Sequence, residues 1–114
     1  MAGTPLPVEL ASFTAEARGH AAHLAWTTAS ETNNAGFEVE ASADGRGFRR
    51  LGWVTGQGSS SAAHAYQFDD GTFAAAPGPL VYYRLRQLDT DGTATFSPVR
   101  SMAVPITRTA QLQL

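Results

Sequence analysis

The chain has 114 residues, with eight arginines against ten acidic residues, so its formal net charge is −2. It contains no cysteine, which excludes disulfides and thiolate-bound zinc. The scattered arginines argue against a nucleic-acid partner, and no apolar run approaches the ~20 residues of a membrane-spanning helix. We therefore expect one domain that neither binds nucleic acid nor inserts into a membrane.

The spacing of turn residues predicts an all-β fold. Eleven glycines and six prolines separate short segments rich in β-branched and aromatic residues. No segment repeats apolar residues at helical spacing over three turns, so we predict almost no helix. Seven antiparallel strands in two layers fit this pattern. We expect the strands at residues 7–17, 21–28, 36–42, 47–55, 63–68, 80–88 and 93–104.

The first predicted strand changes phase in its middle. Val8 and Leu10 share one face, whereas Phe13 and Ala15 share the other. An unbroken strand would point these two pairs to opposite sides of the sheet. We therefore predict a bulge near residues 11–12.

The next segments supply the centre of the core. In residues 21–28, Leu24 and Trp26 alternate with small or polar residues, and Trp26 is interpreted as the central plug of a sandwich. A polar loop is expected at residues 29–34, before a strand whose inward side chains include Phe37.

The second half of the chain continues the pattern. Leu51 and Val54 lie three residues apart in residues 47–55, which indicates a bulged strand that leaves Trp53 exposed. A flexible polar loop is expected at residues 56–61, and Pro98 interrupts the last strand. The predicted core comprises Leu10, Leu24, Trp26, Phe37, Val39, Leu51, Tyr66, Phe68, Tyr83, Leu85 and Val99.

Four blocks of sequence stand out together: LPVELASFTA at residues 6–15, LAWTTASETNN at 24–34, GFEVE at 36–40 and YYRLRQLDTDG at 82–92. In this order they resemble the fibronectin type III-like modules that precede the C-terminal sorting signal of proteins exported by the type IX secretion system. The resemblance covers residues 6 to about 104. Its most specific block is the run from Trp26 to Asn34.

The resemblance implies a seven-stranded antiparallel fibronectin III or immunoglobulin-like sandwich at residues 6–104, between a tail of residues 1–5 and a tail of residues 105–114. That second tail would lead to a sorting domain, and its residues 111–114 alternate as if they began another strand. Neither a sorting domain nor an export leader is present, so we expect a fragment of a longer protein. The implied function is a non-catalytic structural spacer or adhesive module of a secreted or cell-surface protein. We expect it to be monomeric, with adjacent domains of the parent protein as its partners.

No pattern indicates catalysis, a cofactor or a metal site. The serines at 59–61 have no base at suggestive spacing. The histidines His20, His23 and His64 lie on separate segments and are interpreted as surface or rim residues. Residues 89–92 begin like a calcium loop but lack its later carboxylates, and a hairpin turn explains them without a metal. Residues 69–71 are interpreted as another turn.

Two polar groups allow both a functional and a structural interpretation. Glu38 and Glu40 could be a glycosidase pair, but the strand of Arg84 and Arg86 is their neighbour in the fibronectin III topology, which favours a cross-strand ladder of charges. Residues 31–34 could form a ligand-facing loop, or their side chains could satisfy backbone groups of the loop.

Three aromatic residues raise an alternative function, carbohydrate binding. A solvent-facing Trp53 beside Tyr82, with Phe73 as a further candidate, would form a platform on which sugar rings stack. The other interpretation is that Trp53 covers a sheet edge or meets a neighbouring domain. Under the alternative function, glycans are the partner, and Trp53 and Tyr82 are the predicted contacts.

Overall fold

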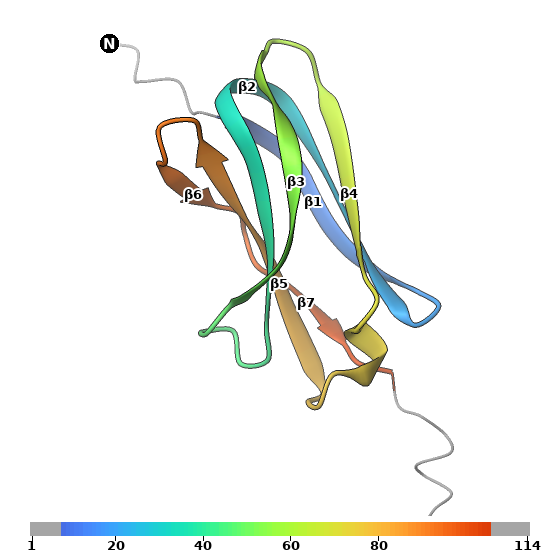
Figure 1. Cartoon of the computed structure of the whole chain (residues 1–114). Helices are drawn as coiled ribbons and strands as arrows, with labels where there is room; N and C mark the ends of the chain where they lie inside the picture. The colour runs from blue at the N-terminus through green and yellow to red at the C-terminus, as the bar shows by residue number, and fades with distance from the viewer. Residues whose placement is uncertain (1–7, 106–114) are drawn as a thin grey trace, which may run out of the picture.

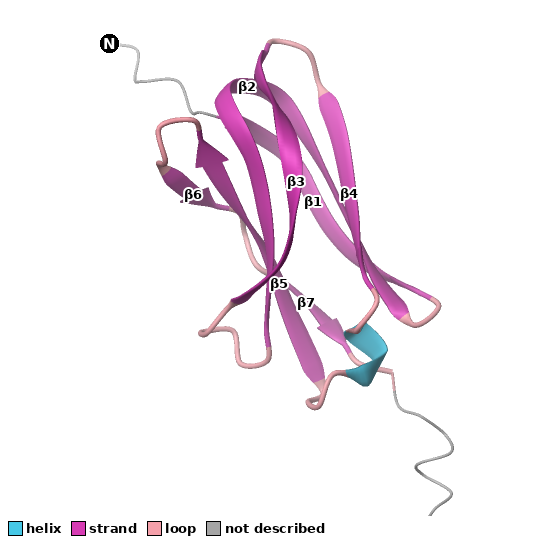
Figure 2. Cartoon of the chain, in the orientation of Figure 1, coloured by secondary structure: helices cyan, strands magenta, loops and turns pink. Residues whose placement is uncertain are grey.

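The computed structural model describes residues 8–105, and these form an all-β fold (Figures 1 and 2). Apart from a single short 3-10 turn, η1, the regular elements of this part of the chain are strands. In chain order they are β1 (Val8–Arg18), β2 (Ala21–Ser42), β3 (Arg49–Ser60), β4 (His64–Asp70), η1 (Phe73–Ala75), β5 (Leu80–Asp89), β6 (Ala94–Phe96) and β7 (Arg100–Ala103).

The seven strands form one antiparallel sheet that curls on itself. The first half of β2 pairs with β1 and β4, and its second half pairs with β3 and β5. Strand β5 pairs in turn with β6 and β7. Because β2 belongs to both parts of the sheet, the two parts face each other across a shared interior.

The predicted loop at residues 29–34 is wrong, because β2 runs without a break through this region. The strand bends there instead. Its pairing with β3 shifts register on both sides of Asn34, and Asn33 adopts a positive φ of 52°. At such a bend the alternation of inward and outward side chains is interrupted, although the backbone stays paired. The sequence pattern therefore looks the same as that of a polar loop.

The interior is built around Trp26, which is 1 % exposed. Its indole lies 5.5 Å from the Phe37 ring, 5.8 Å from the Tyr66 ring and 6.4 Å from the Phe13 ring, measured between ring centroids. Mixed edge-on and stacked contacts of this kind are favourable between aromatic rings. The prediction that Trp26 is the central plug is confirmed.

Most of the predicted core is correct. Seven of its residues are fully buried, and three more, at positions 10, 51 and 68, pack against the core while partly buried. The prediction for Val99 is wrong, since it is 45 % exposed. It lies in the unpaired stretch that separates β6 from β7 at Pro98, where no sheet ladder fixes its face. The buried hydrophobic residues missing from the prediction are Val8, Phe13, Ala22, Ala41, Phe73 and Val81.

Both predicted bulges are confirmed. The β1–β2 register shifts on either side of Leu10, and the β2–β3 register shifts between Val39 and Glu40. The predicted loop at 56–61 is largely wrong, because β3 continues to Ser60. The predicted final strand is present as two short strands, β6 and β7. The predicted tails at residues 1–5 and 105–114 lie outside the described residues, apart from Pro105.

Candidate functional site

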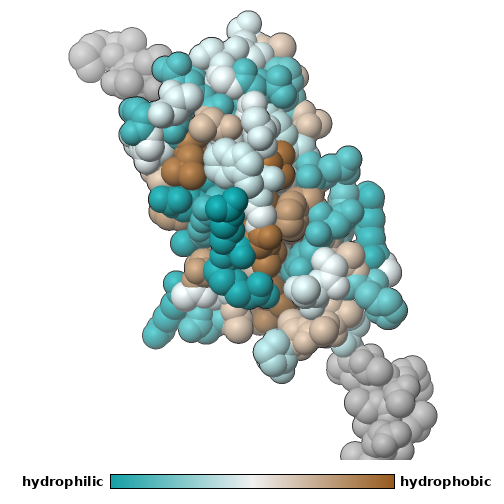
Figure 3. Space-filling model, viewed as in Figure 1, coloured by the Kyte–Doolittle hydropathy of each residue, from teal (hydrophilic) through white to brown (hydrophobic). Residues whose placement is uncertain are grey.

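Charged side chains form a ladder across the outer face of β3, β2 and β5. Arg84 donates to Glu40 at 2.7 Å, from Nε to Oε1. Glu38 Oε2 lies 3.8 Å from Arg86 Nη1 and 3.9 Å from Arg50 Nη1. The predicted cross-strand ladder is therefore confirmed. The face of the molecule seen in Figure 3 carries a hydrophilic band bordered by apolar patches.

The two carboxyl groups of this ladder influence each other. The neighbouring carboxyl of Glu40, followed by burial, raises the pKa of Glu38. For Glu40, burial acts in the same upward direction, but interactions with Glu38 and with the Arg84 guanidinium outweigh it and hold the pKa below its usual value. Glu40 is thus the carboxylate that is fixed by a strong ion pair, and Glu38 is the more easily protonated one.

Arg84 also lies between two aromatic rings. Its guanidinium carbon is 3.9 Å from the centroid of Phe48 and 4.1 Å from that of Phe96. A cation held over two ring faces and paired with Glu40 is fixed in position. No sequence pattern indicates this stack, because Phe48, Arg84 and Phe96 come from three separate segments.

Trp53 stands at the β3 side of the same face and is 37 % exposed. Its ring packs against the backbone of β2 at Gly36, where an added Cβ would lie 2.4 Å from the ring. Its Nε1 donates to Thr55 Oγ1 at 3.2 Å. The indole is therefore held against the sheet while more than a third of the residue remains in contact with solvent.

The structure does not bring Tyr82 beside Trp53. Trp53 is opposite Glu38 on β2, whereas Tyr82 is opposite Ser42. These β2 positions are four residues apart, which corresponds to about 13 Å along a strand. The two aromatics also flank β2 from opposite sides, so they do not form one platform. Phe73 is 1 % exposed in η1 and belongs to the core.

The bend of β2 encloses a buried carboxylate, Glu31, which is 2 % exposed. Its Oε1 accepts hydrogen bonds from Asn34 Nδ2 at 2.7 Å and from the Gln57 backbone N–H at 3.0 Å. Its Oε2 accepts from Thr28 Oγ1 at 2.9 Å and from the Tyr66 hydroxyl at 2.5 Å. Burial alone would raise the pKa of Glu31, but these four hydrogen bonds outweigh it and lower the pKa.

This arrangement favours the structural interpretation of residues 31–34. Glu31 joins both halves of β2 to β3 and β4, and Asn34 is 1 % exposed. The Asn33 N–H bonds to Ser59 Oγ at 3.0 Å. The side chains of Glu31 and Asn34 are therefore internal and hold the bend, whereas Asn33 is exposed and contributes its backbone N–H.

Two of the three histidines have a polar partner, and His23, interpreted from the sequence as a surface or rim residue, is instead buried at 6 % exposure. His23 Nδ1 lies 2.6 Å from Asp69 Oδ1, and His64 Nε2 lies 2.9 Å from Ser60 Oγ. Asp70, interpreted from the sequence as part of a turn, is instead buried and accepts a hydrogen bond from the Tyr83 hydroxyl at 2.7 Å. Within residues 8–105, no three histidine, aspartate or glutamate side chains are grouped to hold a metal ion.

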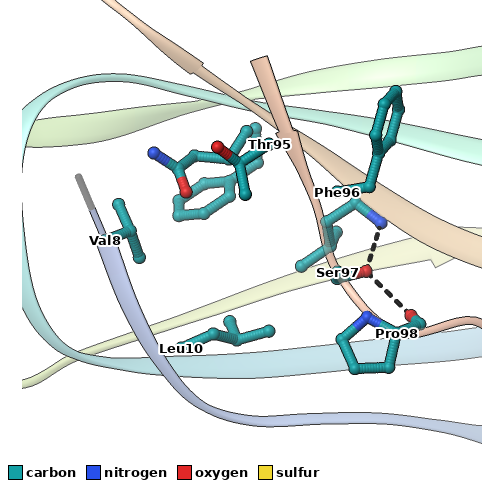
Figure 4. Close-up of a pocket in the computed structure, with 9 residues that line it drawn as sticks. Val8, Leu10, Thr95, Phe96, Ser97 and Pro98 are labelled. Atoms are coloured by element: carbon teal, nitrogen blue, oxygen red, sulfur yellow. Dashed lines mark hydrogen bonds between the residues drawn. The ribbon is translucent and has the colours of Figure 1, made fainter. Parts of the chain in front are cut away.

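An apolar hollow of about 220 Å³ lies between β1 and the segment that begins in β6 and ends at Pro98 (Figure 4). Val8 and Leu10 lie on one side of it and residues 95–98 on the other, with Phe37 and Leu85 also among its lining residues. Of its nine lining residues none carries a charge. It therefore offers shape and apolar surface but no group for acid–base chemistry.

Comparisons with known proteins identify no relative. No protein-family model matches the sequence, no curated protein matches it, and no solved structure matches the fold. In the described part of the chain, no helix has the length and apolar character needed to cross a membrane.

Proposed function

We propose that this chain is a fibronectin III-like module that acts as a non-catalytic spacer or adhesive unit within a larger exported protein. The strand pairing supports it, with β1 and β4 on one half of β2 and β3 and β5 on the other. The buried carboxylates of Glu31 and Asp70 also support it, because both accept hydrogen bonds inside the fold. The link to exported proteins comes from the resemblance of the four sequence blocks at residues 6–15, 24–34, 36–40 and 82–92.

One observation carries the spacer role: the described chain begins and ends at opposite poles (Figure 1). Val8 lies beside residues 95–98, at the end of the fold that holds β6. Ala103 pairs with Leu80, where β5 begins at the other end. A domain attached before β1 and another attached after β7 would be separated by the length of the fold. For a strand of eleven residues such as β1, that length is about 35 Å.

A distance measurement tests the spacer role directly. The native chain has no cysteine, so Glu9→Cys and Ala103→Cys, both at exposed positions, can be labelled with a dye pair. Single-molecule energy transfer should give one narrow distance distribution of about 30–40 Å. The same sample in urea supplies the control for a flexible chain. A broad distribution under native conditions would contradict a stiff spacer.

Sequencing the gene that encodes this chain, on both sides of the segment, tests the link to export. A passenger domain encoded before this segment and a sorting domain encoded after it would support the proposal. An intact reading frame that contains neither would overturn the export role and leave only the fold proposal.

Trp53 favours a second candidate function, carbohydrate binding. A flat ring that is backed by the Gly36 backbone and open to solvent is suited to stack on the apolar face of a sugar. Tyr82 is too far from Trp53 to share one sugar ring. A role for Tyr82 would therefore require a longer oligosaccharide that crosses the charged ladder.

A further inference from the structure

We propose that Trp53, together with Arg50 and Arg86, binds a sugar that carries a carboxylate, as in a uronic-acid polysaccharide. This inference rests on the second candidate function, because it names the class of sugar that the Trp53 face would take. The observation behind it is the juxtaposition of an exposed indole with two incompletely paired guanidinium groups.

The pairing pattern places these groups together. Trp53 is opposite Glu38, and Glu38 is opposite Arg86, so the three side chains lie in one row across β3, β2 and β5. Arg50 reaches the same row, because its guanidinium lies 3.9 Å from Glu38 Oε2. One carboxylate oxygen therefore stands between two cations and beside one ring.

The charges of this row do not balance. Arg50 and Arg86 approach a single oxygen of Glu38 at 3.9 and 3.8 Å, both longer than a charge-assisted hydrogen bond. By contrast, Glu40 is already engaged by Arg84 at 2.7 Å. Two guanidinium groups thus share one carboxylate, which leaves a surplus positive charge next to Trp53. The side chains of Arg50 and Arg86 are 58 % and 34 % exposed, so an incoming anion can reach them.

The chemistry of a uronic acid complements this arrangement. Its ring has a C–H face that can lie on the indole, and its carboxylate can accept paired N–H groups from an arginine. An acidic peptide could satisfy the guanidinium groups but would make no use of a flat, rigidly backed ring. These features favour the sugar, and the peptide becomes an outcome of the test.

The test uses tetragalacturonate as the acidic probe and cellotetraose as a neutral probe of equal length. Calorimetric titration measures the affinity, and tryptophan fluorescence locates the contact, because Trp26 is 1 % exposed and Trp53 is 37 % exposed. We expect tetragalacturonate to bind and to change the fluorescence, with an affinity that falls as salt is added. Cellotetraose should bind at least about tenfold more weakly, the ratio that one charge-assisted hydrogen bond supplies.

Four variants separate the contacts from the scaffold. Trp53→Ala should abolish binding, and Arg86→Ala should weaken it about three- to tenfold. Glu38→Gln should tighten tetragalacturonate binding while leaving cellotetraose unchanged, because it removes the competing carboxylate. Arg18→Ala is the matched control, because this exposed arginine pairs with Glu16 at the end of β1, outside the row, and the change should leave the affinity for tetragalacturonate unchanged. Thermal unfolding of each variant verifies that the fold is intact.

The outcomes distinguish this inference from the function on which it rests. Equal binding of both tetrasaccharides through Trp53 would overturn the preference for acidic sugars and keep carbohydrate binding. Binding of neither would overturn both. Binding of polyglutamate as tightly as tetragalacturonate would replace the sugar with an acidic peptide.

Discussion

The carboxylate of Glu31 should be among the most important polar groups for stability, and two substitutions test this. Glu31→Ala removes the acceptor of four hydrogen bonds from Thr28, Asn34, Gln57 and Tyr66, and leaves their donors in a buried site. We expect it to lower the free energy of unfolding by about 3–5 kcal/mol, the usual cost of breaking a buried charged network. That is a large part of the ~5–15 kcal/mol that stabilises a whole domain.

Glu31→Gln should cost much less, about 1–2 kcal/mol. The amide oxygen can accept from Asn34 and Gln57, and the amide nitrogen can donate to the hydroxyls of Thr28 and Tyr66, which act as donors or acceptors. Only the charge is lost. Urea unfolding followed by circular dichroism measures both variants. Glu16→Ala is the control, because the side chains of Glu16 and of its partner Arg18 are about 60 % exposed, so the change should be within about 0.5 kcal/mol.

The Glu31→Gln variant also tests how the free energy of unfolding depends on pH. The folded-state pKa of Glu31 lies below its ordinary value of 4.5. Its contribution to stability is therefore fully present above that value and is lost as the pH falls through the lowered pKa. Glu31→Gln cannot be protonated, so its free energy of unfolding should fall less steeply than that of the native protein below about pH 4.5. Equal stability of the Ala and Gln variants, or an unchanged acid profile, would refute this account of the bend.

Three further substitutions test other parts of the fold, each by urea unfolding. Trp26→Ala should lower the free energy of unfolding by about 3–5 kcal/mol. A loss as small as that of a surface substitution would contradict the central role of Trp26 in the core. Gly56→Ala should be destabilising by about 1–3 kcal/mol, because its Cβ would lie 2.3 Å from a buried asparagine side chain. Gly47→Ala, with no atom within 4 Å of the added Cβ, is its control and should be nearly neutral. Tyr83→Phe should cost about 1–3 kcal/mol by removing a hydrogen bond to the buried Asp70 carboxylate; no change would mean that the pair contributes nothing.

Local alternation was enough to predict much of this protein. Because side chains in a strand alternate between faces, the sequence alone indicated an all-β fold, the inward position of Trp26 and the outward position of Glu38 and Arg86. The phase change between Leu10 and Phe13 even indicated a bulge. These features depend on neighbours within a few residues of each other, which a sequence displays directly.

The tertiary structure decided what depends on pairs far apart in the chain. The sequence placed Glu31 in a polar loop and left two interpretations open, and only the bend of β2 against β3 and β4 shows that this carboxylate is buried. Arg84 contacts Phe48 and Phe96 because β5 lies between β2 and β6. The register of these strand pairs is not visible in any local sequence pattern. The separation of Trp53 from Tyr82 has the same origin. Alternation gives the face of each side chain, whereas strand register gives its neighbours, and the neighbours determine what a surface can bind.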